Sequence, residues 1–417
     1  MSSAHQILLL TPQLPYPPQQ GTAIRNFNLL AQLARRHTID LLTFLQPGDE
    51  LSEHSPLHDL CRTIVTVPAP QRTSGARLQA TLTSPLPDMA LRLEAPAMWQ
   101  ALRDLLQRQT YDVVQIEGIE MAAYGLATRG VRLTPGATVL PTPAANPRII
   151  FDDHNAEYVL QQRAFQTDIR RPRRWAAALY SLIQWQKLRH YERSICRQVD
   201  GVAAVSAVDA AALRRLIPGL QPAVVPNGVD LASYALDRVD PLDLGPAALV
   251  FTGKMDFRPN VDAVQWFLPA LAQVRQAVPK ARFFVVGQKP HARLAHLTAD
   301  QGVVVTGQVP DTRPYIAGAA VYVVPLRIGG GTRLKVLEAM ALGRAIVSTR
   351  LGVEGFDVAD GRELRLADTP QAFAQIVIEL LEDDAQRARL GATARAFVAA
   401  RYGWERLVPA LERLYGE

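Results

Sequence analysis

Short apolar runs alternate with amphipathic segments along the first half of the chain. Ile7–Thr11 and Thr38–Thr43 have the length and composition of buried strands. The segment between them, Ala23–Arg36, has helical periodicity, with an apolar face formed by Ile24, Phe27, Leu30, Leu33 and Ala34. Because a strand, a crossover helix and a second strand form the unit of a parallel sheet, the pattern predicts an α/β fold.

Three further apolar runs, Val113–Ile116, Ile149–Asp152 and Gly201–Val205, extend this sheet, and each stops at polar residues. The stretch Pro47–Leu93 has scattered prolines and threonines and predicts a partly helical excursion at one edge. The carboxyl ends of parallel strands lie along one edge of a sheet. We therefore expect a polar group at that edge, made of Glu117, Asp152, Asp153, His154 and Asn155.

A second series of strands and helices follows the proline-punctuated stretch 218–246. Its predicted strands are Leu249–Thr252, Arg282–Val286, Val303–Thr306, Val321–Val324 and Ala345–Ser348, and its predicted helices are Asn260–Val278, Val336–Leu342 and Pro370–Leu381. A chain of 417 residues also exceeds the ~250–300 residues at which a single core stops growing. The sequence thus predicts two doubly wound parallel-sheet domains, 1–217 and 247–391, joined by a linker at 218–246.

Composition narrows the class of protein. Hydrophobic residues make up 48% of the chain and charged residues 20%, which is the balance of a folded globular protein. No apolar run approaches the ~18 residues of a membrane span, and the start of the chain lacks the form of a signal peptide. The two cysteines, Cys61 and Cys196, lack ligand spacing, which argues against structural zinc and favours a reducing compartment, with the cytoplasm as the expected location.

The net charge of +6 is small for the length and indicates an anionic partner other than nucleic acid. Many of the basic residues lie in Arg163–Arg197, with Trp175, Tyr180 and Trp185 between them. One interpretation is a long surface helix with a solvated basic face. The other is a docking face for an anionic membrane, where aromatic and basic residues lie at headgroup level. That second interpretation would place the protein peripherally at the inner face of the membrane.

The strongest local signal lies in the stretch Val323–Thr349. A strand ends there, a helix begins, and the turn between them is formed by Gly329, Gly330, Gly331 and Thr332, which let the backbone approach a ligand closely. The free N–H groups at a helix start favour an anion, and Arg333 and Lys335 add positive charge. We therefore expect this turn to hold a phosphate group.

Other residues extend this expected phosphate site. Glu338, farther along the same helix, is placed to accept hydrogen bonds from the diol of a ribose, although it could also be an exposed helix residue beside a flexible loop. Lys254 and Arg258 follow the first strand of the second domain, and Lys254 is interpreted either as a phosphate contact or as a solvated lysine. Gly287 and Gly307 end the next two strands and allow the backbone to approach a ligand closely. Glycine after a strand is also common in ordinary turns.

In the first domain, Gly21 lies just before the predicted helix, so its backbone could face a phosphate or a sugar. The chain lacks the dinucleotide fingerprint G-x-G-x-x-G, which disfavours an NAD enzyme. His154 is the histidine that lies at a strand end in the expected cleft, which favours a functional role. The alternative interpretation is a structural histidine that is hydrogen-bonded to Asp152 or Asp153. Adjacent residues of a strand point to opposite sides, and no second histidine cluster completes a site, so we expect no metal.

With these segments in place, the chain resembles the retaining nucleotide-sugar glycosyltransferases of family 4, which have the GT-B fold. The resemblance runs through Thr11–Gly21, Ile149–Glu157, 224–230, 251–260, 307–309 and 329–343. It implies two Rossmann-like domains facing each other across a cleft, with 1–217 on the acceptor side and 247–391 binding the donor. It also implies that the helical tail, 392–417, packs back on the first domain; the family's tail is similar to Ala392–Leu414.

The resemblance assigns roles to several positions. Gly21 would face the donor phosphates or sugar, and His154, the catalytic candidate, would contact the donor sugar near its reacting carbon. Lys254 would stand where the family places a phosphate-binding arginine, and Glu338 would hold the ribose. Arg258, Gly307, Gly329, Gly330, Gly331, Thr332, Arg333 and Lys335 complete the expected donor site.

Two positions depart from the family pattern. The first of its paired glutamates falls on Gly330, so its contact with sugar hydroxyls would pass to backbone amides or be lost. A usual lysine falls on Pro259, and Arg258, or Arg333 with Lys335, would replace it. These changes leave the donor sugar open.

The predicted function is transfer of a sugar from a nucleotide-diphosphate-sugar donor to a hydroxyl of a glycan or lipid-linked acceptor, with retention of configuration and without metal or cofactor. Lys254, Arg258, Arg333 and the amides of 329–332 would stabilise the leaving diphosphate. The rival functions are a nucleotide-sugar epimerase of the same fold and a catalytically inactive nucleotide-sugar-binding protein, for which Gly330 is the main argument.

Overall fold

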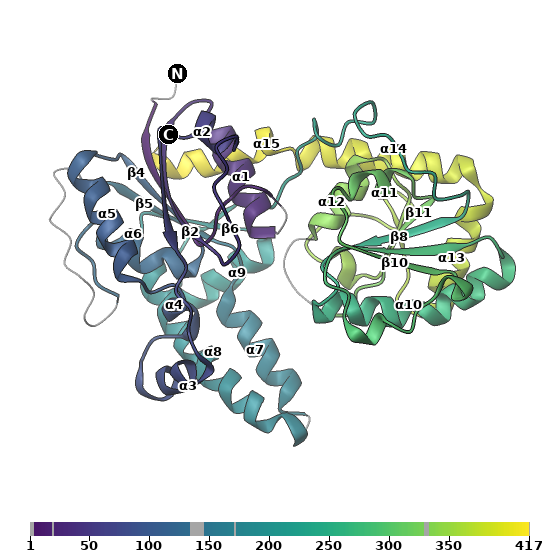
Figure 1. The fold of residues 1–417 in the computed structure, drawn as a ribbon, viewed down its shortest axis with the longest axis horizontal. Helices are drawn as coiled ribbons and strands as arrows, with labels where there is room; N and C mark the ends of the chain where they lie inside the picture. Colours follow the sequence, from purple (N-terminus) through teal and green to yellow (C-terminus); the bar gives the residue numbers. More distant parts are fainter. Residues whose placement is uncertain (1–3, 19–20, 134–145, 171, 329–332, 417) are drawn as a thin grey trace. The chain divides into compact units, whose positions relative to one another are not determined.

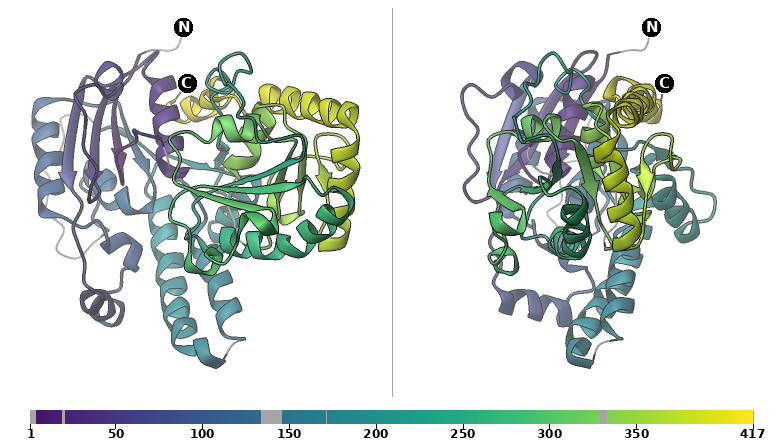
Figure 2. Two further views of the ribbon diagram at one scale, coloured as in Figure 1. Left: turned by 45° about the vertical axis from the view of Figure 1, so that its right-hand side comes forward. Right: turned by 90° about the vertical axis from the view of Figure 1, so that its right-hand side faces the viewer.

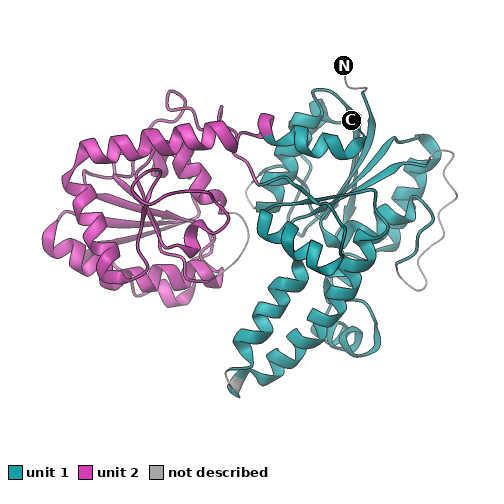
Figure 3. Ribbon diagram, turned by 180° about the vertical axis from the view of Figure 1, so that it is seen from behind, with its two compact units in different colours: residues 1–226, 407–417 teal, residues 227–406 magenta. Residues whose placement is uncertain are grey.

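The structure is a computed structural model that describes all residues except 1–3, 19–20, 134–145, 171, 329–332 and 417. The chain divides into two compact units, residues 1–226 with 407–417, and residues 227–406 (Figure 3). The boundary at Pro226 lies inside the stretch 218–246 that the sequence analysis assigned to a linker.

The first unit is built on a seven-stranded parallel sheet in the order β3-β2-β1-β4-β5-β6-β7. Its strands are β1 (Gln6–Thr11), β2 (Thr38–Leu45), β3 (Thr63–Pro68), β4 (Val113–Glu117), β5 (Arg148–Asp153), β6 (Gly201–Ala204) and β7 (Ala223–Val224). The apolar residues of β1 and β4 are fully buried, as expected of parallel strands covered on both faces.

Helices surround this sheet and also project from it (Figures 1 and 2). They are α1 (Gly21–Leu33), α2 (Leu57–Leu60), α3 (Ser74–Thr83), α4 (Asp88–Leu91), α5 (Pro96–Arg108), α6 (Ala122–Ala127), α7 (Glu157–Asp168), α8 (Trp175–Cys196) and α9 (Ala207–Leu216). The pair α7 and α8 extends away from the sheet, and α3 packs beside α8. These three helices form a lobe at one end of the unit.

The second unit has a six-stranded parallel sheet in the order β10-β9-β8-β11-β12-β13. Its strands are β8 (Ala248–Thr252), β9 (Arg282–Val286), β10 (Val303–Gly307), β11 (Val321–Val324), β12 (Ile346–Ser348) and β13 (Arg365–Leu366). Its helices are α10 (Arg258–Ala277), α11 (Arg313–Ala317), α12 (Leu334–Ala341), α13 (Pro370–Glu382) and α14 (Asp384–Arg401). Both sheets therefore have the doubly wound order predicted from the sequence.

The stretch 47–93 is partly helical and lies at one edge of the sheet, as predicted, and it also contains the edge strand β3. One prediction about this unit was wrong. The segment 163–197 is not one long helix, because α7 ends at Asp168 and α8 begins at Trp175. Pro172 fits this break, since proline cannot continue a helix and opens a new one readily.

The helix after β1 also differs from its prediction, because it starts at Gly21 rather than after it and ends at Leu33. Its buried residues are Ala23, Arg25, Asn26, Leu29, Leu30 and Leu33, so two polar side chains lie on the face that meets the sheet. Ile24 and Phe27, which the apolar pattern placed on that face, are only partly buried. Arg25 and Asn26 are buried in place of Ile24 and Phe27 because they bind carboxylates of the sheet.

The C-terminal segment is shared between the units. Helix α14, which contains the first residues of the predicted tail 392–417, belongs to the second unit, and residues 407–417 belong to the first. A last helix, α15 (Trp404–Glu412), spans that boundary. Glu412 pairs with Arg36 and with His37 of the first unit, the latter at 3.1 Å. Cys61 and Cys196 are buried and free.

No helix among the described residues has both the length and the apolar character needed to cross a bilayer.

Candidate functional site

The strand order of each sheet reverses at one point, between β1 and β4 in the first unit and between β8 and β11 in the second. Such a position is called a switch point, and in open parallel sheets ligands bind there, outside the carboxyl ends of the strands. The polar residues expected at the first of these edges do lie together, because Glu117 of β4 is the register partner of Asp152 of β5. Gly21 is an exposed residue in the first turn of α1.

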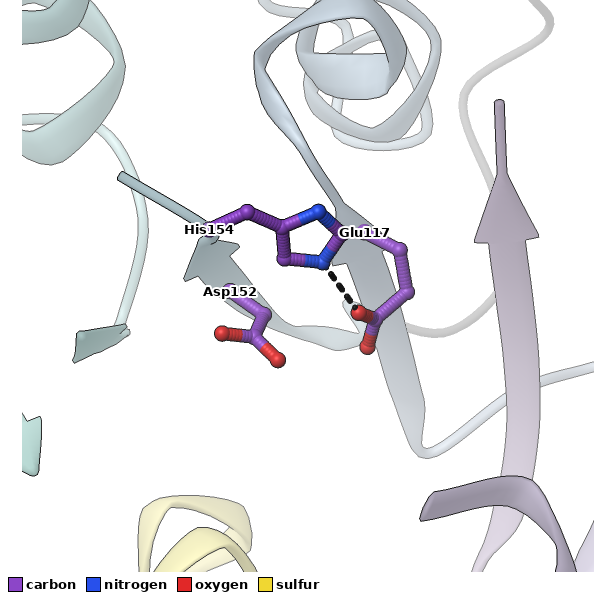
Figure 4. A group of neighbouring side chains, drawn as sticks. All are labelled: Glu117, Asp152 and His154. Carbon is purple, nitrogen blue, oxygen red and sulfur yellow. Dashed lines mark hydrogen bonds and ion pairs between the residues drawn. The ribbon is translucent and has the colours of Figure 1, made fainter. Parts of the chain in front are cut away.

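The central contact of the first edge joins His154 to Glu117 (Figure 4). The Nε2 atom of the histidine lies 2.8 Å from Oε2 of the glutamate, whose side chain is fully buried. Although burial opposes ionisation of Glu117, the hydrogen bond and charge of His154 help to lower its pKa. An ionised carboxylate only accepts hydrogen bonds, so Nε2 carries the proton and Nδ1 is the nitrogen left for other contacts.

Asp152 is held by Arg25 of α1. The guanidinium donates from Nε and Nη2 to the two carboxylate oxygens at 2.8 and 2.9 Å, and from Nη1 to the carbonyl of Val225 at 2.9 Å. Both side chains of the pair are buried. Asn26, in the amide orientation that satisfies its oxygen and nitrogen, donates to Glu117 at 2.9 Å. The polar residues of α1 therefore face the sheet because they complete this network.

A chain of hydrogen bonds leads from the C-terminal segment to His154. The hydroxyl of Tyr415 donates to Gln115 at 3.1 Å, and the amide of Gln115 donates to Glu117 at 2.8 Å. Glu117 then accepts from His154. Gln115 and Glu117 are two residues apart on β4, so their side chains lie on the same face of the sheet.

Glu117, Asp152 and His154 have ligand atoms within 4.8 Å of one another, a spacing that a metal ion could use. Adjacent residues of one strand point to opposite sides, but Glu117 comes from the neighbouring strand, and Asp152 and His154 are two residues apart. The donors of Arg25 and Gln115 nevertheless occupy these carboxylates. The group is thus an ion-pair network whose carboxylates already accept hydrogen bonds from protein donors.

His154 opens onto a cavity of about 500 Å³ within the first unit. Its lining includes Thr22, Arg92, Gly118, Glu120 and Asn155. A second cavity, of about 390 Å³, shares Met89 and Arg92 with the first and is lined by further basic and polar side chains, Arg72, Arg77, Asp88, Tyr180 and Gln184. Together the two cavities give the first unit space for a ligand larger than a single sugar.

In the second unit, close backbone packing shapes the edge at the switch point. A Cβ atom at Gly287 would lie 1.8 Å from the carbonyl oxygen of Gly253, so only glycine fits there. A Cβ atom at Gly253 would lie 2.7 Å from Nδ2 of Asn260 and 2.8 Å from Nζ of Lys335. Gly307 ends β10 with φ +72° and has open space at its Cβ position. Glycine at 287 is thus required by backbone packing, and glycine at 253 is favoured by a positive φ of +152°.

Lys335, in the first turn of α12, lies at the centre of this edge. Its ammonium donates to Oδ1 of Asn260 at 2.9 Å and stands 4.1 Å from the centre of the Phe251 ring. Burial and, secondarily, the charge of Arg333 lower the pKa of Lys335 to about 7. An arriving anion would raise the pKa of Lys335 again, because a nearby negative charge favours the charged ammonium, as Glu338 already does in part.

The other candidate cations differ in exposure. Lys254 is exposed and lies 3.8 Å from Asp256, a weak ion pair. Arg258 is exposed at the first position of α10. Arg333, at the N-cap of α12, is partly buried. The predicted turn Gly329, Gly330, Gly331 and Thr332 lies outside the described residues.

Glu338 is partly buried on α12 and accepts a hydrogen bond of 3.0 Å from the hydroxyl of Tyr234. The interpretation of Glu338 as a freely exposed helix residue is therefore wrong. Burial raises the pKa of Glu338, with Tyr234 and Lys335 acting in the opposite direction. A carboxylate in this setting gains from a further pair of hydroxyl donors, such as those of a ribose.

Several residues of these edges were not predicted from the sequence. Arg25 and Asn26 were passed over as the polar positions of an amphipathic helix, and Gln115 as part of an apolar strand. Tyr234 lies in the stretch assigned to a linker. An adjacent Arg-Asn pair inside an otherwise apolar helical face was the signal that could have revealed the network.

Two family models match the chain and together span most of it. Residues 20–233 match the model described as Glycosyltransferase Family 4, and residues 246–383 match Glycosyl transferases group 1. A phosphatidyl-myo-inositol mannosyltransferase of Mycolicibacterium smegmatis is 32% identical over 46% of this chain and 50% of that protein, so the match spans only half of that relative.

Another relative matches over a longer range. A GDP-mannose-dependent alpha-(1-6)-phosphatidylinositol monomannoside mannosyltransferase of Mycobacterium tuberculosis is 27% identical over 71% of this chain and 85% of that protein. Among solved structures, sucrose-phosphate synthase from Thermosynechococcus elongatus superposes with a TM-score of 0.68 at 21% identity, covering 98% of both chains, and shares the GT-B fold. The chain belongs to glycosyltransferase family 4 and has the GT-B fold.

Proposed function

We propose that the protein transfers a sugar from a nucleoside-diphosphate-sugar donor to a hydroxyl of a lipid-linked or glycan acceptor, with retention of configuration and without a metal ion. The observation that carries this proposal is the edge of the second sheet, where Lys254, Lys335 and Glu338 surround the switch point. The cations suit a diphosphate, and the carboxylate suits a ribose.

In the proposed reaction, the bond between the anomeric carbon and the phosphate oxygen breaks, and its electron pair stays on the diphosphate. The acceptor oxygen bonds to the same carbon from the face that the leaving group departs, and its proton passes to the departing phosphate. Lys254, Arg258, Arg333 and the amides of 329–332 stabilise the developing charge. Gly21 faces the donor, and Gly307 leaves room beside it.

His154 contacts the donor sugar through Nδ1 in this proposal, while Glu117 acts as a positioning residue. The buried carboxylate fixes the ring and its tautomer. The adjoining cavity, of about 500 Å³, receives the acceptor. Since the relatives named above are mannosyltransferases of phosphatidylinositol lipids, GDP-mannose and phosphate-bearing lipids are the first donor and acceptors to test.

A panel of nucleoside diphosphates and their sugars tests the donor assignment. A ligand present at about a hundred times its dissociation constant stabilises the folded protein by roughly 2.7 kcal/mol, which thermal unfolding detects readily. The cognate donor is then incubated with phosphate-bearing lipids, and the anomeric configuration of the product is read by NMR. Absence of a thermal shift with every nucleotide would refute the donor site.

The same experiment distinguishes the rival functions. An epimerase converts the donor without any acceptor, so incubation with the donor alone separates it from a transferase. An inactive binding protein shows the thermal shift but no turnover with any acceptor. A chelator in the assay tests metal independence, and loss of transfer that added Mg²⁺ restores would contradict that part of the proposal.

A further inference from the structure

Large exposed apolar side chains gather on the lobe formed by α3, α7 and α8. Of eleven such side chains among the described residues, five lie there, with exposed fractions between 48% and 72%. These five form what we call the apolar patch, namely Leu78, Leu82, Ile169, Trp175 and Leu179. Isolated apolar residues are ordinary on a protein surface, but a concentration on one lobe indicates a contact surface.

Helix α3 is the clearest part of this surface. Thr81 is its one buried residue, and Leu78 and Leu82, one turn apart, face outward. The helix is held to α8 mainly by polar contacts, since Lys187 donates to the carbonyls of Thr81 and Ser84 at 2.7 and 2.6 Å. A ten-residue helix is marginal in water without an apolar partner, so α3 has the character of a helix that completes its packing elsewhere.

The second half of the patch lies at the start of α8. Trp175 and Leu179 are one turn apart and exposed, and Ile169 precedes them in the turn between α7 and α8. Tryptophan at the rim of an apolar surface is typical of a contact with the interface of a bilayer, where an apolar ring meets polar headgroups.

The same lobe is also rich in basic residues. By sequence, residues 163–197 contain nine lysines and arginines and two acidic residues, so their net charge of +7 exceeds the +6 of the whole chain. Arg189 and Arg193 continue the exposed side of α8 beyond Leu179. One of the two acidic residues, Glu192, is buried and offers no charge to the surface. The lobe thus combines exposed apolar residues with a basic surround.

We propose that this lobe docks on an anionic bilayer, with the apolar patch entering the headgroup region and the arginines meeting lipid phosphates. Apolar insertion combined with basic side chains is the usual basis of peripheral binding to anionic membranes. This surface includes α3, which the charge pattern of 163–197 alone did not indicate.

The position of the lobe also bears on how an acceptor would reach His154. This part of the proposal rests on the proposed function. The cavity lined by Arg72, Arg77 and Arg92 lies between α3 and α8 and shares Arg92 with the cavity at His154. A phosphate-bearing headgroup held by the docked lobe would meet these arginines before it reached His154.

Vesicle binding by the full chain tests the docking surface without any sugar donor. The protein is sedimented with vesicles of phosphatidylcholine alone and with vesicles that also contain phosphatidylglycerol. We expect binding to the second kind only, weakened by added salt. The double variants Leu78→Ser/Leu82→Ser and Trp175→Ser/Leu179→Ser should each lose about tenfold in partitioning.

The matched control is Leu236→Ser/Leu242→Ser, which changes two exposed leucines of the second unit and should bind vesicles like the wild type. All variants alter exposed positions, and equal unfolding temperatures confirm that they fold. Trp175 gives a second readout, because its fluorescence should shift to the blue on anionic vesicles and the remaining shift in Trp175→Phe should be small.

Two results would overturn the proposal. In one, the wild type does not bind anionic vesicles, or both patch variants bind these vesicles as strongly as the control variant does. In the other, the protein is a dimer that the patch variants convert to a monomer, with no vesicle binding, which would identify the patch as a contact between two copies. Nucleotide binding is measured separately, so a protein that binds vesicles but no nucleotide would refute only the donor site.

Discussion

The two sheets of this protein differ in how charged side chains are paired at their switch points. In the first unit, Glu117 and Asp152 are buried and already paired with His154 and Arg25. In the second unit, Lys254 is exposed beside a distant aspartate, and Lys335 is partly buried with a neutral amide as its partner. The first edge is complete in itself, since its charges pair with one another and position a side chain, whereas the second edge places cations where an anion could bind.

The largest effect should follow from breaking the complete edge. Arg25→Met leaves Asp152 buried without its partner, which typically costs roughly 3–5 kcal/mol. We expect the unfolding temperature to fall by about 10 °C. Thermal unfolding measures this, and the double variant Arg25→Met/Asp152→Leu should recover much of the loss. A single variant as stable as the wild type would show that the pair does not hold the edge together.

Removing charges from the edge of the second unit should weaken ligand binding, with little change in stability for the exposed Lys254 and some loss for Glu338, which accepts a hydrogen bond from Tyr234. Lys254→Ala and Glu338→Ala each remove one charged hydrogen bond to a nucleotide, worth about 1.5–3 kcal/mol, or roughly tenfold to a hundredfold in affinity. Titration calorimetry with the cognate nucleoside diphosphate measures the change. Lys280→Ala, an exposed lysine before β9, is the matched control. Equal affinities in all three variants would refute both assignments.

A smaller effect is expected at His154. Glu117→Gln keeps the shape of the side chain but removes the charge that fixes the ring, so the transfer rate should fall about tenfold with little change in donor KM. Nitrogen NMR should show that His154 loses its preference for a proton on Nε2. Gln115→Met, which removes the next hydrogen bond only, should change both readouts less. An unchanged tautomer would mean that Glu117 does not position the ring.

The smallest expected effect is a dependence on pH. Because the pKa of Lys335 is about 7, this lysine is partly neutral at neutral pH, and a bound diphosphate should raise its pKa. Binding should therefore take up a proton, and affinity should decline as pH rises above 7, by at most about tenfold per unit. Calorimetry in buffers of different ionisation enthalpy measures the uptake, which Lys335→Met should reduce. Equal uptake in both proteins would assign the proton to the ligand.

The sequence predicted most strands of both sheets, since buried parallel strands are continuous apolar runs such as Val321–Val324, but it did not predict the edge strands β3, β7 and β13. It also placed Glu117 and His154 at one edge, because that follows from strand ends alone. It did not predict which groups pair there. The bond between Glu117 and His154 and the pairing of Arg25 with Asp152 depend on side-chain directions across strands and helices, which periodicity does not encode.

The lobe illustrates a second limit of the sequence. Aromatic and basic residues within 163–197 indicated an unusual surface, but Leu78 and Leu82 come from a distant segment that the tertiary fold brings beside α8. A break in the helix at 169–174 also depends on a short connection that the helical pattern concealed.

Residues 407–417 belong to the first unit, although the whole second unit lies between them and residue 226. During synthesis, residues 227–406 emerge before residues 407–417 and can fold as a body. Glu412 and Tyr415 reach their partners only after the chain has been made almost to its end. The hydrogen bonds that lead from Tyr415 to His154 are thus among the last that a nascent chain can form. A ribosome-bound chain stalled before residue 407 should therefore fold the second unit before the first unit reaches its final stability.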